Sequence, residues 1–566
     1  MRLGKQLAAV FLLTVLACLI VLVGLSPAWA AHPPWLPAGL ADLPIAYGQT
    51  VTGVIAAPAQ VVTYTFTAGG GDVIIVGLSD DDAAFDPEVE LFDSNDTPLA
   101  SNWDGGNYAE LIHTLPASGT YRLVVGDNGA TDTAAYALYL QRLNGPANAA
   151  PLALGQMAAG SITQPAQMDA YTVTVSAGDV ALFGLADDNA FFEPEIRLYA
   201  ADGSAVASNW STGNYVELNR TFTLPGTFTV LVRDRGGTEA ANYTLNPQRF
   251  NNPLNAAPLA PGGVTAGTIT LPGEVNFYTF TVAAGDIMLA RLSDNGGLFS
   301  PQLRLYTAAG AMLQSVSDPG NQVELSRTFA ASGTYTLMVR DNGGTGVAAY
   351  GLYLQRLNNP ANAVPLPYKQ TANGVITRLS QMDTYTFTAV LSDTILLSVA
   401  DNSSFFEPEI RLYRSNGQTV AADWAPGNQA VLIQTMPATD TYTLLVGDHS
   451  GTATADYALI LLGSPSTNPR HSARPITAGQ TITDTIGATN QVNWYKIDIP
   501  QPGSALTITL SAAAGDHDLY LFAPQVDEET GQLRDIGAFV DIGAFVDIGA
   551  FVDIGAFVDI GAFVDI

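Results

Sequence analysis

The chain has 566 residues and a formal charge of −30, from 52 acidic against 22 basic residues, and only 13% of its residues are charged. A chain this acidic repels phosphate groups, which argues against nucleic acid and anionic membrane surfaces as partners. The length is enough for several domains, and an apolar fraction of 47% is enough to give each of them a core.

The first 30 residues have the pattern of a secretory signal peptide. Arg2 and Lys5 form a basic start, a long apolar stretch follows, and Ala28 and Ala30 form an A-x-A cleavage pattern. We therefore expect a secreted or cell-surface protein that meets a membrane only if this segment stays uncleaved. The single cysteine, Cys18, lies inside the segment, so the mature chain is expected to hold no disulfide.

After a Pro-rich lead at 31–42, a unit of about 107 residues occurs four times and is then begun a fifth time. A YTFT-type run starts at Tyr64, Tyr171, Tyr278 and Tyr385, and a FEPEIRLY-type run contains Pro87, Pro194, Pro301 and Pro408. The predicted modules are 43–149, 150–256, 257–363 and 364–466, with a truncated fifth module at 467–534. Such repeats decide the architecture before any other feature does.

Within the second module, apolar and polar residues alternate in Thr-, Val- and Tyr-rich runs such as YTVTV from Tyr171. A period of two predicts half-buried β-strands. About eight are predicted, near 157–164, 169–175, 180–186, 195–201, 205–209, 215–224, 226–234 and 241–250. The fold class expected is all-β, with tandem antiparallel β-sandwich modules of jelly-roll or Ig-like type. Asn, Pro and Ala at each junction predict short, stiff linkers in a beads-on-a-string array.

The order of these motifs resembles the bacterial pre-peptidase C-terminal domain. The resemblance is strongest in the fifth unit, at 492–524, where D-x-D-L-Y-L-F runs from Asp516 to Phe522. The four full modules depart from the family pattern, with Glu-Ile-Arg-Leu-Tyr at this strand. The resemblance implies a jelly-roll-like sandwich that is appended to secreted peptidases, and it implies Ca²⁺ binding in some members.

The tail at 535–566 repeats the hexamer DIGAFV without change. It stands where the second half of the fifth module is expected, so we interpret it as a tandem expansion or an assembly error. The tract is apolar, β-prone and free of proline, which makes it an aggregation hazard if it is expressed.

No catalytic set is found in the sequence. The five histidines occupy no repeated position, and neither H-E-x-x-H nor G-x-S-x-G occurs. We therefore expect no catalysis from these modules, although a Ser-His-Asp arrangement formed only in space stays open.

Repeated acids form the first candidate site. The third strand of each module is predicted to end in an aspartate and the seventh strand in another, 47 residues later: Asp80 and Asp127, Asp187 and Asp234, Asp294 and Asp341, Asp401 and Asp448. Alternating strands would place both at one end of the sandwich, where carboxylate oxygens could bind Ca²⁺. The alternative is that each aspartate caps a turn through backbone amides. The third module has no further acid in the first of these loops, which weakens a shared site.

A repeated tryptophan forms the second candidate site. Trp103, Trp210 and Trp424 occupy one position in a polar hairpin, and the third module has Ser317 there. These side chains could contact a ligand by stacking on a sugar ring or a protein surface, or they could fold over the edge of the sandwich.

The sequence thus predicts a secreted or cell-surface, non-catalytic repeat protein that acts as a spacer, adhesion or binding array for a glycan, protein or envelope ligand. Weak sites in series would gain avidity. The alternative is a set of accessory domains of a secreted peptidase whose catalytic domain lies outside this chain.

Overall fold

The computed structural model describes residues 42–462, 474–487 and short segments between 493 and 553. The predicted signal peptide and most of the lead lie outside the described residues, and so does most of the DIGAFV tract. Among the residues described, no helix is long and apolar enough to cross a membrane.

The first module consists of nine strands in two sheets. They are β1 (Leu43–Pro44), β2 (Gln49–Ile55), β3 (Val62–Ala68), β4 (Val73–Asp80), β5 (Pro87–Phe92), β6 (Pro98–Trp103), β7 (Tyr108–Thr114), β8 (Gly119–Asp127) and β9 (Ala134–Arg142). One sheet has five strands in the order β1-β3-β8-β5-β6, and the other has four in the order β2-β9-β4-β7.

The next three modules repeat this arrangement with the same sheet orders. The second has β10 (Ala150–Pro151), β11 (Ala158–Ile162), β12 (Met168–Val175), β13 (Val180–Asp187), β14 (Pro194–Tyr199), β15 (Ala205–Trp210), β16 (Tyr215–Thr221), β17 (Gly226–Asp234) and β18 (Ala241–Arg249). The third has β19 (Ala257–Pro258), β20 (Gly263–Ile269), β21 (Val275–Val282), β22 (Ile287–Asp294), β23 (Pro301–Thr307), β24 (Met312–Ser317), β25 (Gln322–Thr328), β26 (Gly333–Asp341) and β27 (Ala348–Arg356). The fourth has β28 (Val364–Pro365), β29 (Thr371–Ile376), β30 (Met382–Ala389), β31 (Thr394–Asp401), β32 (Pro408–Tyr413), β33 (Thr419–Trp424), β34 (Gln429–Thr435), β35 (Asp440–Asp448) and β36 (Ala455–Leu462).

Shorter strands follow in the C-terminal part of the chain. They are β37 (Arg474–Ile476), β38 (Tyr495–Ile497), β39 (Ala505–Leu506), β40 (Tyr520–Phe522), β41 (Gln525–Val526), β42 (Leu533–Arg534), β43 (Phe539–Asp541) and β44 (Val552–Asp553).

The predicted fold class, tandem antiparallel β-sandwiches, is confirmed. In the second module, eight observed strands match the eight predicted from alternation. The structure adds a ninth, because each module opens with a two-residue strand that pairs in parallel with the YTFT-type strand, as Leu43 does with Tyr64. Two residues are too few to show a period, so alternation could not predict this strand.

The repeated tyrosine that opens each YTFT-type run joins the two sheets. Its hydroxyl forms a buried hydrogen bond with a tyrosine of the opposite sheet, at 2.8 Å for Tyr64 with Tyr136 and at 2.7 Å for Tyr385 with Tyr457. The second ring lies across a glycine of the neighbouring edge strand. A Cβ at Gly374 would lie 2.2 Å from the Tyr457 ring, so only glycine fits there.

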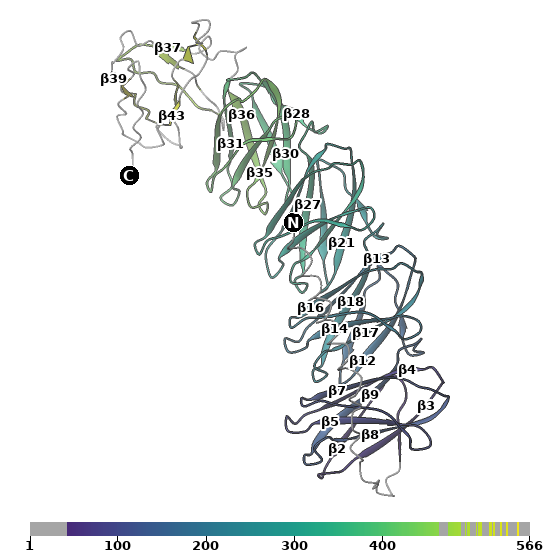
Figure 1. Cartoon of the computed structure of the whole chain (residues 1–566). Coiled ribbons are helices and arrows are strands. Elements are labelled where there is room, and N and C mark those ends of the chain that lie inside the picture. The colour runs from purple at the N-terminus through teal and green to yellow at the C-terminus, as the bar shows by residue number, and fades with distance from the viewer. Residues whose placement is uncertain are drawn as a thin grey trace, which may run out of the picture.

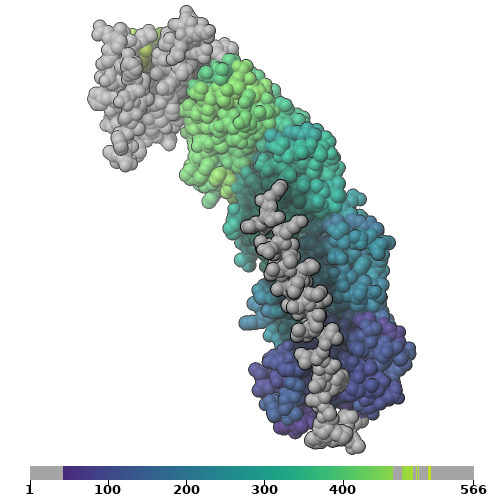
Figure 2. All heavy atoms as spheres, in the orientation of Figure 1, coloured from purple at the N-terminus to yellow at the C-terminus, as the bar shows by residue number. Residues whose placement is uncertain are grey.

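Successive modules are stacked face to face, so the described modules pack on one another and are not separated by linkers as the beads-on-a-string prediction had them. The outer face of each four-stranded sheet packs on the outer face of the next five-stranded sheet, through apolar clusters that include Ile75 with Leu231 and Leu289 with Leu445. Strands such as β13 are therefore buried on both faces. The modules form a curved rod in which neighbours are in contact (Figures 1 and 2). The strands run across this rod, so the loops lie along its sides.

Candidate functional site

Two arginines and two glutamates connect the first and second modules. Glu110 on β7 accepts from Arg197 at 2.6 Å and from Arg233 at 2.5 Å. Both arginines also pair with Glu195 of their own module, at 2.8 and 2.9 Å. Arg233 is 2% exposed. A buried pair of this kind stabilises less than its Coulomb energy suggests, but losing one partner leaves a costly unpaired charge.

The second junction repeats this geometry with one change. Glu217 accepts from Arg304 at 2.8 Å and also pairs with Arg340. Gln302 stands where the first junction has Glu195, so one carboxylate here faces two guanidinium groups.

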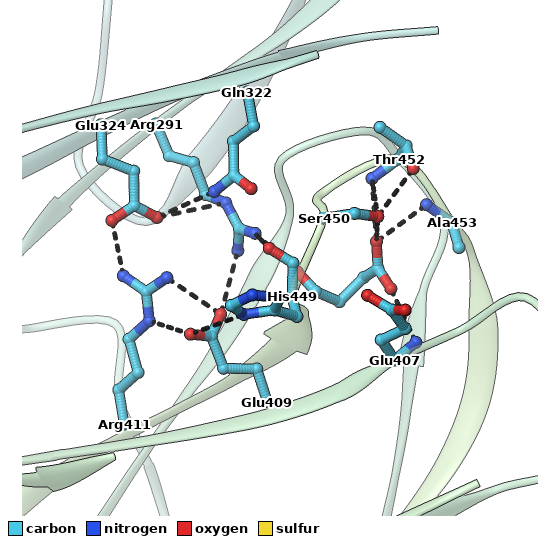
Figure 3. Close-up of polar contacts among 11 residues, drawn as sticks. Arg291, Gln322, Glu324, Glu407, Glu409, Arg411, His449, Ser450, Thr452 and Ala453 are labelled. Atoms are coloured by element: carbon cyan, nitrogen blue, oxygen red, sulfur yellow. Dashed lines mark hydrogen bonds and ion pairs between the residues drawn. The ribbon is translucent and has the colours of Figure 1, made fainter. Parts of the chain in front are cut away.

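The third junction obtains its second guanidinium from the opposite side (Figure 3). The fourth module has Gly447 where its predecessors have Arg233 and Arg340, and the third has Arg291 where its predecessors have glycine. Arg291 is fully buried and lies 3.3 Å from Glu324 and 3.7 Å from Glu409. Its Nη2 also donates to the carbonyl oxygens of residues 448 and 449, at 2.6 and 2.7 Å.

An open groove of about 410 Å³ lies beside this network. Its lining residues come from the β24–β25 hairpin and the loop after β35: Asp318, Asn321, Gln322, His449, Ser450 and Thr452. This hairpin has Ser317 at the position that holds tryptophan in the other three modules. The lining offers polar groups of both donor and acceptor type.

The predicted tryptophans lie at one end of the sandwich. We call this end the loop pole; it holds the β4–β5, β6–β7 and β8–β9 loops and their equivalents. There Pro87 pairs with Asp127 and Glu88 pairs with Trp103. Trp103 is 50%, Trp210 40% and Trp424 45% exposed, a degree of exposure that fits both a ligand contact and a ring lying over the edge of the sandwich.

Two of these rings are covered on one face. The Arg235 guanidinium lies 3.6 Å from the centre of the Trp210 ring. The imidazole of His449 stacks on Trp424 at 3.9 Å between ring centres. The matching residue in the first module is Asn128, which has neither a ring nor a guanidinium. The arrangement holds the two rings in place and leaves part of each surface open.

The aspartates that end the seventh predicted strand of each module cap turns. Asp127 Oδ1 accepts the backbone N–H of Asp86 at 2.9 Å, and its Oδ2 accepts those of Thr131 and Asp132 at 2.8 and 3.1 Å. Burial acts upward on the pKa of Asp127, but these backbone hydrogen bonds hold it below its ordinary value. Asp234, Asp341 and Asp448 accept the same set of bonds. The turn-capping alternative therefore describes the geometry of this set.

The aspartates that end the third predicted strand use only one of their two carboxylate oxygens in hydrogen bonds. Their Oδ1 accepts the N–H two residues on, at 2.9 Å for Asp80 and 3.1 Å for Asp187. Their Oδ2 atoms are buried and have no hydrogen-bond partner in any of the four modules, including those of Asp294 and Asp401. Burial raises the pKa of Asp80 and of Asp187 to about 6. Within the described residues, no group of three or more His, Cys, Asp or Glu side chains could hold a metal ion.

A second repeated position on the loop pole carries a large apolar side chain. Phe191 is 78%, Leu298 93% and Phe405 84% exposed, and the first module has Ala84 there. Sequence reasoning passed over this position and over the junction arginines. The doubled Phe-Phe of FFEPEIRLY was the available signal, since a strand end buries only one of two adjacent rings.

The chain matches no protein-family model and no curated protein. Among solved structures it is similar to the pre-peptidase C-terminal domain of a collagenase from Bacillus anthracis, with 21% identity over 18% of this chain and 98% of that domain, and a TM-score of 0.17. It is also similar to the BSP domain of a biofilm-associated protein, with 9% identity over 76% of this chain and 99% of that one, and a TM-score of 0.15.

A third similar structure contains the M60 catalytic domain with two CBM51 domains from Clostridium perfringens ZmpB. Its identity is 9% over 71% of this chain and 55% of that one, and its TM-score is 0.15. Identities and TM-scores this low carry no functional argument. The architecture defined here, a tandem array of β-sandwich modules, rests on the strands and their pairing.

Proposed function

We infer that this chain is an extracellular, non-catalytic binding and spacing array that engages an extended ligand, with a glycan as the favoured class. The observation that supports this is the equivalent placement of Trp103, Trp210 and Trp424 on stacked modules. Each ring is about half exposed on the loop pole. A half-exposed, fixed indole offers a flat face to a sugar ring.

The stacking makes the repeated sites useful together. Because packed junctions fix each module relative to the next, the rings recur at set intervals along the rod. Weak sites held at set intervals gain affinity from the effective concentration that the first contact creates. The groove at the third junction adds polar lining residues, one of which, His449, stacks on Trp424.

Binding to a glycan array tests this proposal. The triple variant Trp103→Ala, Trp210→Ala and Trp424→Ala should lose at least about ten-fold in apparent affinity, because three stacking contacts are removed. The matched gain-of-contact variant is Ser317→Trp, which adds the ring that the third module lacks and should bind more tightly. Unchanged glycan binding in both variants would refute the role of this position.

The peptidase-accessory alternative keeps the same binding role and adds a catalytic domain elsewhere. Extending the reading frame beyond the DIGAFV tract distinguishes the two, because a following H-E-x-x-H or Ser-His-Asp domain would make this array an accessory region.

Calcium is a second proposal, and it concerns the third-strand aspartates. Asp127 and its equivalents already accept backbone N–H bonds through both oxygens, so they are poor ligands. One free buried oxygen remains in each module, on Asp80, Asp187, Asp294 and Asp401. Since Ca²⁺ takes six to eight oxygens, backbone carbonyls and water would have to complete the site. A rise in melting temperature on adding Ca²⁺, reversed by a chelator, would support this; equal melting temperatures would reject it.

A further inference from the structure

The outward face of the four-stranded sheet of the fourth module differs from the three faces before it. The glutamate that receives the next module's arginine, Glu110, Glu217 or Glu324, is replaced here by Val431. The polar position of Gln141, Gln248 and Gln355 becomes Leu462, and that of Tyr139 and Tyr353 becomes Ile460. Every one of these changes makes the face more apolar.

These residues form a cluster of their own. Leu396, Ile460 and Leu462 are buried, and Val431 and Ile433 pack against them. This cluster is separate from the core between the two sheets of the module. It occupies the place where the earlier modules have the junction clusters that contact their successors.

The described parts of the fifth unit open in the manner of a module. Strands β37 and β38 pair in parallel with Arg474 opposite Tyr495, as β28 and β30 pair with Val364 opposite Tyr385. The Asn493 side chain donates to the carbonyl oxygen of Thr485 at 3.2 Å, eight residues back. In the third module, Asn276 makes the same contact with Thr268 at 2.7 Å.

The fifth unit also changes at the position that would meet Val431. Aligned by sequence, Leu519-Tyr520-Leu521-Phe522 matches Ile410-Arg411-Leu412-Tyr413. Tyr520 therefore stands at the position of the arginines that reach back to the preceding module. Glutamate becomes valine on one side of this junction and arginine becomes tyrosine on the other, so both halves of the ion pair are replaced together.

We propose that the outward face of β29, β36, β31 and β34 is a docking surface for the fifth unit, whose β37, β38 and β40 strands stack on it through apolar contacts. A second copy of the chain fits less well. The five-stranded sheet of the first module carries Glu90 at the position of Arg197, and placing this carboxylate against Leu396, Val431 and Ile460 would desolvate it.

Hydrogen exchange on the full chain tests the proposal. Val431→Glu places an unpaired carboxylate at the docking surface, so peptides that cover β34 and β38 should exchange at least about ten-fold faster. Val431→Ile keeps the surface apolar and should leave exchange unchanged. Adding Tyr520→Arg to Val431→Glu rebuilds the ion pair of the earlier junctions and should restore protection in both peptides.

The core of the fourth module provides the control for folding. Peptides of β35 face the inner core and should exchange as in the wild type in every variant. Unchanged exchange at β34 and β38 in Val431→Glu, or failure of Tyr520→Arg to restore protection, would overturn the proposal. A dimer in sedimentation that Val431→Glu converts to a monomer would also overturn it, because a second copy would then cover this face.

Discussion

Replacing Arg291 by alanine should strongly destabilise the junction between the third and fourth modules. The side chain is fully buried and lies between Glu324 and Glu409. With it present, two guanidinium groups balance two carboxylates; without it, Arg411 alone faces both. Its hydrogen bonds to the carbonyl oxygens of residues 448 and 449 are lost as well.

The expected cost follows from the unpaired charge. Removing one partner of a buried ion pair costs about 3–5 kcal/mol, because the remaining charge stays buried. Arg291→Met fills most of the same space without a charge. If the lost charge and not the lost volume causes the destabilisation, this variant should lose nearly as much stability as Arg291→Ala. Burial acts upward on the pKa of Glu324, but Arg411 and Arg291 hold it below its ordinary value. The stability that this depressed pKa contributes is lost as the pH falls. The difference in free energy of unfolding between wild type and variant should therefore become smaller at acid pH.

Urea denaturation measures this cost when it is monitored through hydrogen exchange of the peptides that cover β22 and β32. The double variant Arg291→Gly with Gly447→Arg moves the guanidinium to the side used by the two earlier junctions. It should recover about half of the loss, since a Cβ at Gly447 would lie 2.9 Å from the Gln381 carbonyl oxygen and part of the gain goes to relieving that contact. A loss under about 1 kcal/mol in Arg291→Ala would show that the network is not a buried charge balance.

Three further expectations concern the module itself. Asp187→Asn keeps an oxygen that can accept the Asn189 N–H, but the new side chain cannot ionise. In the wild type, burial raises the pKa of Asp187 to about 6, so the folded protein binds a proton at this side chain more tightly than the unfolded chain does. The free energy that protonated Asp187 contributes to folding is therefore present at pH 4 and is lost as the pH rises through 6. Over that window, thermal melts should show the stability of the variant rising relative to the wild type, by at most about 3 kcal/mol. A stability difference that does not change with pH would contradict the raised pKa. Tyr171→Phe removes one hydrogen bond from the buried Tyr243 hydroxyl and leaves Asp169 as its remaining partner. The free energy of unfolding, measured by denaturant melts, should fall by about 1 kcal/mol. An unchanged value would mean that the hydrogen bond between the sheets contributes nothing to stability. Gly374→Ala puts a methyl group 2.2 Å from the Tyr457 ring and should cost at least about 1–3 kcal/mol, which a wild-type melting curve would refute.

Much of the fold could be predicted because each strand carries its own period. The alternation of Thr with Val or Phe in β12 and β21 shows one buried face without reference to any distant residue. The stacking of modules could not be derived in this way. Arg197 and Arg233 occupy outward positions that look solvent-facing in sequence. The residue that pairs with both, Glu110, lies 87 and 123 positions earlier.

A signal for stacking was nevertheless present. The strand VALFGLAD has no polar side chain before its last residue, which is typical of a strand buried on both faces. The candidate sites divide similarly. The polar hairpin indicated tryptophans outside the core, but it left open whether their rings contact a ligand or fold over the edge of the sandwich. The role of Asp127 could not be predicted, because its partners are backbone N–H groups whose direction only the folded loop defines.

The module that supplies the second guanidinium differs between junctions, and this difference limits which modules can be lost or duplicated. Deleting the second module would bring Glu110 against Arg304 and Arg340, the same set that Glu217 meets now, so this loss keeps a working junction. Deleting the third would leave Glu217 and Glu409 with Arg411 alone. Duplicating the third would place Arg291, Arg304 and Arg340 around Glu324. Unequal recombination between these repeated units should therefore be tolerated where it removes the second module and selected against where it removes or duplicates the third.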